Sequence, residues 1–295
     1  MRKMWLLPII GTIGNFFSAC MIAIFPLGII SFIAYLLLSG RGIVSPTIAA
    51  SIVISIDVLL VILYQAYLFY LGASGKGTKQ LARLYGTRPL NNEENEFVKP
   101  LIHEVLAKHN KLNNVNWVFG KDINLTIKDD EEISTISFGH NQVGITTGFL
   151  EGSSNEVFKS MLAYHLARLY FKTSVIDMTY YFVQTPTRIA LSMLKTGNFK
   201  TDKDEKKIKK ILLLPAVVVG KVVDILCNIV QRVVSQQEVL KSDAYVVKLG
   251  YADGLLSMLA CTYKVKPSIL TKFFGYHPEP KLRIENVKAI LEQSK

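Results

Sequence analysis

The sequence predicts an α+β fold, in which a domain of helices with a small sheet is carried on N-terminal transmembrane helices. Half of the 295 residues are hydrophobic and only 19% are charged, against roughly 25% in soluble domains. The charges avoid the N-terminus, because residues 1–73 hold only Arg2, Lys3, Arg41 and Asp57. Further along, a helical pattern, short β-rich runs and more helical patterns follow one another. These observations exclude a plain soluble globule and a disordered chain.

Residues 1–75 are predicted to be a membrane anchor with two transmembrane helices. Met4–Gly40 contains no charged residue and Val44–Gly75 contains only Asp57, and each run exceeds the roughly 20 residues that a spanning helix needs. The first run is also too long for a cleaved signal peptide, whose apolar region covers about 7–15 residues. Asp57 inside a span predicts a hydrogen bond between helices, with a further functional role as the alternative.

The basic residues that flank these runs predict the orientation of the chain. Only Arg41 lies between the two runs, whereas six basic residues lie outside them: Arg2, Lys3, Lys76, Lys79, Arg83 and Arg88. The positive-inside rule therefore predicts a multi-pass protein of the plasma (bacterial inner) membrane with its main domain in the cytoplasm. The net charge of +11 favours acidic membrane lipids as partners, and no nucleic acid is expected.

Residues 76–295 are predicted to form the main domain, with an apolar insert at about 209–234. Lys221 and Asp224 lie near the middle of this insert. A membrane span and an amphipathic helix in the membrane interface both remain open.

The local patterns of the domain predict its elements. Residues 91–110 have a capped helical pattern, with Phe97, Leu101, Val105 and Leu106 on one side and with Pro100 as a kink or break. A capping box at Ser153–Glu156 starts a helix that extends to about Lys172. Four strand-like runs lie between the two helices, at 116–120, 123–127, 133–139 and 142–150.

The five histidines do not show the spacing of a zinc site. His103 is followed by Glu104, but His109 comes six residues later, and a zinc-binding helix needs histidines at i and i+4. We therefore expect helix 91–110 to be a solvated surface helix. The three cysteines contain no C-x-x-C pair, so neither a disulfide framework nor a thiolate metal site is indicated.

Residues 148–170 read GFLEGSSNEVFKSMLAYHLARLY. Read without gaps, this stretch resembles the HtpX-like membrane zinc metallopeptidases, a family that includes the CAAX-prenyl endopeptidases. In that family a strand ending in Thr-Thr-Gly-Leu-Leu and an acidic turn precede Ala-His-Glu-x-x-His. Thr146–Leu150 match the strand, Glu156 falls in the turn, and Ala163 precedes the motif.

Three further segments support the resemblance, which covers nearly the whole chain. Residues 85–98 resemble the family's link between spans and domain, residues 235–250 the helix that supplies the third zinc ligand, and residues 277–287 the closing His-Pro-Pro-x-x-x-Arg-Ile motif. The resemblance implies a zincin-like domain, a zinc cofactor and proteolysis.

The chain departs from the family at every position that would carry the chemistry. Tyr164 and Arg168 stand at the two zinc-histidine positions, His165 at the general-base glutamate, and Val239 at the third ligand, with Glu238 one residue early. A guanidinium has no lone pair for a metal, and catalysis needs three ligands and a group that activates water. We therefore expect vestigial positions, no bound zinc and no catalytic residue.

The resemblance also implies two structural features. Asp243 matches the family's aspartate behind the ligands, so we expect it to form an ion pair with Arg168 in place of the zinc. The strand at 142–147 matches the edge on which the family docks substrate by β-augmentation, which makes Val143, Gly144, Ile145, Thr146 and Thr147 the expected peptide-binding edge.

The resulting prediction is a membrane-anchored pseudopeptidase that binds protein or assembles within a membrane or secretion-type complex. Its oligomeric state stays open. The alternative is an active zinc metalloendopeptidase in membrane protein quality control, so its status as an enzyme also stays open. A third interpretation, transport or lipid binding, depends on Asp57 and the apolar insert.

Overall fold

The computed structural model describes residues 26–40, 44–185, 236–263 and 278–293, together with Ile9 and Ile13. Most of the first apolar run, the apolar insert at 209–234 and His277 lie outside the described residues. The chain divides into two compact units. The first comprises Met1–Ala73 and Thr179–Asn228, and the second comprises Ser74–Met178 and Ile229–Lys295.

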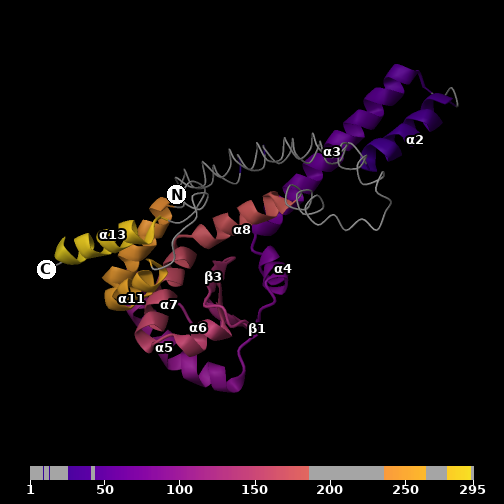
Figure 1. Ribbon diagram of the computed structural model, residues 1–295. Helices are drawn as coiled ribbons and strands as arrows, with labels where there is room; N and C mark the ends of the chain where they lie inside the picture. Colours follow the sequence, from indigo (N-terminus) through magenta and orange to yellow (C-terminus); the bar gives the residue numbers. More distant parts are fainter. Residues whose placement is uncertain are drawn as a thin grey trace, which may run out of the picture. The chain divides into compact units, whose positions relative to one another are not determined.

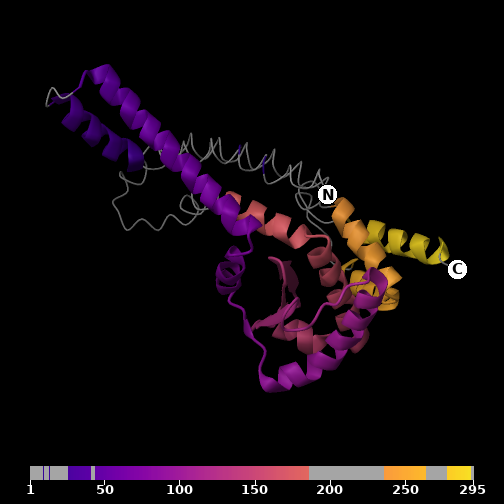
Figure 2. The ribbon, with the colours of Figure 1, turned by 180° about the vertical axis from the view of Figure 1, so that it is seen from behind.

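In the first unit, α2 (Pro26–Gly40) and α3 (Pro46–Ala73) pack side by side as a hairpin (Figures 1 and 2). The hydroxyl of Ser31 donates a hydrogen bond of 2.6 Å to the carboxylate of Asp57. This contact confirms the predicted hydrogen bond between helices.

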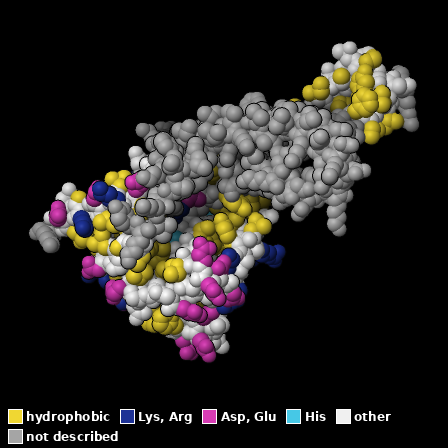
Figure 3. All heavy atoms as spheres, in the orientation of Figure 1, with side chains coloured by type: hydrophobic (Ala, Val, Ile, Leu, Met, Phe, Trp, Pro, Cys, Tyr) yellow, Lys and Arg dark blue, Asp and Glu magenta, His cyan; other side chains and the backbone are white. Residues whose placement is uncertain are grey.

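Helix α3 is 28 residues long. Among the described residues it is the one helix whose length and apolar composition are sufficient to cross a membrane. Figure 3 shows apolar side chains over the visible end of the α2–α3 hairpin. Many large apolar side chains of α3 are exposed, among them Ile48, Ile54, Leu59, Leu63, Tyr67 and Tyr70.

The second unit combines helices with a small sheet, as the sequence predicts. Its helices are α4 (Gly77–Leu84), α5 (Asn92–Asn113), α6 (Thr147–Gly152), α7 (Asn155–Tyr170), the first part of α8 (Thr173–Val183), a helical segment at 236–248, α11 (Ala252–Tyr263) and α13 (Pro280–Gln293). Helix α11 packs against both α7 and α13 (Figure 1).

The sheet has four strands in the order β1-β2-β4-β3. These are β1 (Arg88–Pro89), β2 (Asn124–Lys128), β3 (Thr135–Phe138) and β4 (Gln142–Thr146). Strand β4 is parallel to β2 and antiparallel to β3. The strand expected at 116–120 does not form, apart from an isolated bridge between Phe119 and Ile123, and residues after Thr146 begin α6 instead of extending β4.

The expectation that residues 142–147 form the edge of the sheet is wrong. Strand β4 pairs on both sides, so Val143, Gly144, Ile145 and Thr146 are internal, and Thr147 belongs to α6. All four of these strand residues are buried, as in a strand covered on both faces. A Cβ on Gly144 would lie 3.1 Å from the Ile136 side chain, so this strand fits closely against β3.

Helix α5 is amphipathic rather than solvated. Its buried face consists of Val98, Ile102, Val105, Leu106 and His109, whereas Phe97 is 49% exposed. The helix continues through Pro100 without a break. The apolar face of α5 and residues of the sheet, α7, the 236–248 segment and α11 form one core.

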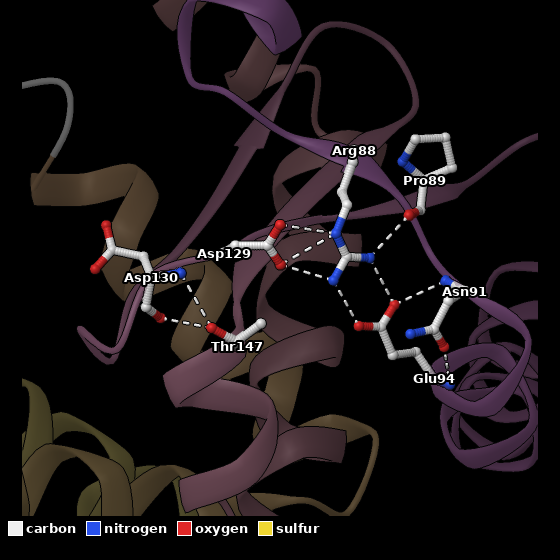
Figure 4. A network of polar contacts seen from close by, with 7 residues as sticks. All are labelled: Arg88, Pro89, Asn91, Glu94, Asp129, Asp130 and Thr147. Atoms are coloured by element: carbon white, nitrogen blue, oxygen red, sulfur yellow. Dashed lines mark hydrogen bonds and ion pairs between the residues drawn. The ribbon is translucent and has the colours of Figure 1, made fainter.

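Arg88 connects the short strand β1 to its neighbours (Figure 4). Its guanidinium binds Glu94 of α5 at 2.8 Å and Asp129, just after β2, at 2.7 Å. Glu94 also accepts from the backbone N–H of Asn91, whose side chain accepts from the N–H of Glu94, which completes a capping box. The network fixes the start of α5 against the sheet.

Candidate functional site

A pocket of about 330 Å³ lies in the second unit, between β3 and helices α7, α8, α11 and α13. Its size is within the range of small-ligand and peptide pockets. The residues that line it are Thr135, Ile136, Ser137, Met161, Tyr164, His165, Arg168, Asp177, Met258 and Arg283. Three of the four vestigial positions predicted from the sequence are therefore in one pocket.

The start and spacing of α7 place these three residues. Ser154 caps the helix by accepting a hydrogen bond from the N–H of Val157, so the N-cap is one residue later than the sequence suggests. Residues four apart on a helix lie on the same face, which brings Tyr164 and Arg168 to the same side. His165 also reaches the pocket, where its Nε2 atom lies 3.0 Å from the hydroxyl of Thr135.

Arg168 forms its ion pair with Asp177, not with Asp243. Its Nη2 atom binds the Asp177 carboxylate, and its Nε atom donates to the hydroxyl of Ser137 at 3.1 Å. Lys172, at a φ of 60°, turns the chain between α7 and α8, and this turn allows Asp177 to return to Arg168. Burial lowers the pKa of Arg168, but the charge of Asp177, the Tyr164 side chain and the hydrogen bond to Asp177 together raise that pKa above its ordinary value, so the guanidinium stays charged.

Asp243 forms a bidentate ion pair with Arg283 of α13. The Nε and Nη2 atoms of Arg283 donate to the two carboxylate oxygens at 2.8 and 2.7 Å. The Asp243 side chain is fully buried, and that of Arg283 is 11% exposed. The predicted Arg168–Asp243 pair is therefore wrong, because each residue has a different and better placed partner.

The ring of Tyr164 contacts both guanidinium groups. The centre of its ring lies 5.9 Å from the Arg168 guanidinium carbon and 5.4 Å from that of Arg283, within the range of a cation–π contact. Its hydroxyl oxygen is buried without a hydrogen-bond partner. Buried hydroxyls are normally paired, so this group is an unused donor.

The position expected for the third zinc ligand does not reach the pocket. Val239 is 1% exposed and belongs to the apolar core. The neighbouring Glu238 turns elsewhere, since its carboxylate binds the Nζ atom of Lys241 at 2.7 Å and accepts a hydrogen bond from Thr173. The donor set in the pocket therefore does not fit zinc, and no group of three metal-ligating side chains occurs among the described residues.

The strand at the edge of the pocket is β3. The N–H of Thr146 donates to the carbonyl of Ser134, and the register pairs Thr135 with Ile145 and Ser137 with Val143. In an antiparallel ladder, hydrogen-bonded and non-hydrogen-bonded pairs alternate. The backbone N–H and C=O groups of Thr135 and Ser137 therefore point away from β4, and within the described part of the chain no further strand pairs with β3.

The sequence analysis did not predict the two ion-pair partners in the pocket, Asp177 for Arg168 and Arg283 for Asp243. Arg283 lies in the segment that resembles the closing Arg-Ile motif, so a signal for it was present. Asp177 had no signal, because the left-handed turn at Lys172 uses a residue that does not usually mark such turns.

Comparisons with known proteins found a similar solved structure, but no family profile and no curated protein matches the chain. Among solved structures, it is similar to the crystal structure of S. mikatae Ste24p, with a TM-score of 0.45 and 13% sequence identity. The match covers 97% of this chain and 66% of that one, so the chain spans less than two thirds of its length. A likeness of this size establishes neither a shared family nor a shared activity.

Proposed function

We propose that this protein is membrane-anchored, with a zincin-like domain that binds an extended polypeptide without cleaving it. The observation that carries the proposal is the pocket of about 330 Å³ beside the outer strand β3, lined by Tyr164, His165 and Arg168. A strand edge next to a pocket is the arrangement in which peptides bind by β-augmentation, with main-chain hydrogen bonds to the edge and side chains in the pocket. This mode of binding needs no metal.

Three features support the absence of proteolysis in this proposal. Arg168 and Arg283 bring positive charge to the pocket, Val239 is in the core, and neither Asp177 nor Asp243 is free, because each is paired with an arginine. The exposed apolar face of α3 supports anchoring in a plasma or bacterial inner membrane. The flanking basic residues favour a cytoplasmic domain. The proposed partners are subunits of a membrane or secretion-type complex.

The first test measures metal and proteolysis in the full chain purified in detergent. The proposal expects less than stoichiometric zinc and no casein cleavage that a chelator abolishes. One zinc per chain, lost to chelator together with cleavage activity, would establish the alternative, an active metalloendopeptidase.

The second test measures the predicted use of the β3 edge with fluorescent octapeptide pools. Thr135 and Ser137 offer backbone groups at alternate positions, so N-methylation of alternate peptide residues should weaken binding in one phase and leave the other unchanged. Met258→Trp should fill the pocket and weaken binding, whereas Ser257→Trp, on the exposed face of the same helix, is the matched control. Equal effects of the two N-methylation phases, or of the two tryptophans, would contradict the proposal.

A further inference from the structure

Three of the polar side chains that line the pocket, Tyr164, Arg168 and Arg283, are hydrogen-bond donors. Arg168 and Arg283 both line the pocket, and a guanidinium only donates hydrogen bonds. The buried hydroxyl of Tyr164 is a further donor, and it has no acceptor among the described residues. Because a buried donor that stays unpaired is costly, this hydroxyl beside two guanidinium groups is suited to a ligand that brings acceptor oxygens.

The charges of the pocket indicate which acceptor fits. Each guanidinium is held by one aspartate, so two cations and two anions compensate one another before any ligand binds. A singly charged, planar carboxylate matches guanidinium donors in shape and adds one negative charge. A doubly charged phosphate would place twice that charge near Asp177 and Asp243.

The remaining lining is apolar and lies beside a strand edge. Ile136, Met161 and Met258 supply apolar surface, and Thr135 and Ser137 direct backbone groups away from β4. A carboxylate attached to an apolar group occurs both in a fatty acid and at the C-terminus of a peptide. Only the peptide can also use the backbone groups of β3.

We infer that the pocket captures the C-terminal carboxylate of an extended polypeptide, with Arg168, Arg283 and Tyr164 as the donors and β3 as the strand edge. This inference rests on the proposed peptide-binding function and makes it more specific. It assigns to the arginine at a former zinc-ligand position a new role in recognising the end of a chain.

The test compares octapeptide pools that carry a free C-terminal carboxylate or a primary amide, measured by fluorescence polarisation with the full chain in detergent. Loss of the charged acceptor should weaken binding about tenfold or more, because hydrogen bonds to charged groups are the stronger ones. Oleate is tested as a competitor to distinguish a fatty acid from a chain end.

Variants of the protein test the donors. Tyr164→Phe should weaken binding of the free-acid pool several-fold and leave the amide pool unchanged, and it keeps the ring that contacts both arginines. Tyr251→Phe is the control, because Tyr251 donates to Glu104 outside the pocket. The double change of Arg168→Gln with Asp177→Asn removes both charges of one pair, and it should abolish the preference for the free acid.

Each outcome distinguishes the inference from the function on which it rests. Preference for the free acid that depends on Tyr164 and Arg168 supports both. Equal binding of acid and amide pools overturns the carboxylate inference and leaves peptide binding intact. Binding of oleate without binding of either pool replaces the chain end by a fatty acid, and no binding of any probe overturns the proposed function as well.

Discussion

Removing the carboxylate of Asp243 should strongly destabilise the second unit. Asp243 is fully buried and Arg283 is 11% exposed, so Asp243→Ala leaves a guanidinium in the interior without its counter-charge. Breaking a buried pair in this way costs about 3–5 kcal/mol. For a domain of this size, each kcal/mol lowers the melting temperature by about 2–4 °C, so we expect a decrease on the order of 10 °C.

The matched comparison is an exposed ion pair on the helix that carries Arg283. In the Lys281–Glu285 pair of α13 the side chains are 68% and 61% exposed, so water can replace the lost partner after Glu285→Ala. We expect a loss of at most about 1 kcal/mol there, in the range of exposed pairs. The buried pair should also show strong coupling, with Asp243→Ala and Arg283→Met together costing clearly less than the sum of the two single changes.

Thermal unfolding of the full chain in detergent measures these effects. Trp117 packs on His109 with ring centres 4.7 Å apart, so its fluorescence reports the second unit, in a Trp5→Phe background. Melting temperatures that fall equally for Asp243→Ala and Glu285→Ala, or a double-mutant cycle without coupling, would refute the assignment of the buried pair.

Three further predictions follow from single side chains. Tyr164→Phe should raise the free energy of unfolding by about 1 kcal/mol, because it removes a buried hydroxyl without a partner; a lower melting temperature would show that the hydroxyl is paired. Burial lowers the pKa of His109 to about 4, so the unfolded chain takes up a proton near pH 6.5 and the folded chain does not. The protein should therefore lose up to about 3 kcal/mol as the pH falls from 6.5 to 4, and in His109→Gln this part of the pH dependence should disappear from the unfolding curves. Cys261 is exposed; with Cys20 and Cys227 replaced by serine, it should react with a membrane-impermeant maleimide only after cells are permeabilised, and labelling in intact cells would place the domain outside.

The sequence predicted the helices and the identity of the pocket residues on α7 better than it predicted their partners. Helix starts are local, since a cap such as Ser154 or Asn91 acts within its own turn. The spacing of Tyr164 and Arg168 is likewise a property of a single helix. These features were correct, apart from a shift of one residue at the cap of α7.

Strand order and ion pairing depend on contacts between distant residues, which no local pattern contains. Strands β3 and β4 are neighbours in sequence, but β2 lies beside β4 and leaves β3 at the edge. Either Arg168 or Arg283 could have been the partner of Asp243 by residue type, and the sequence alone does not distinguish them. The partner was decided by where α13 packs.

The two arginines also relate the proposed absence of catalysis to the proposed binding of a carboxylate. Arg168 and Arg283 both line the pocket and contact the Tyr164 ring, and a guanidinium has no lone pair to offer a metal ion. The N–H groups of a guanidinium can instead donate to the oxygens of an anion. In this proposal Arg168 therefore has two effects: it offers no ligand to a metal ion, and it supplies donors to a carboxylate. Helix α7 and the 236–248 segment need no ion between them, because Ala163 and Val239 belong to the same apolar core.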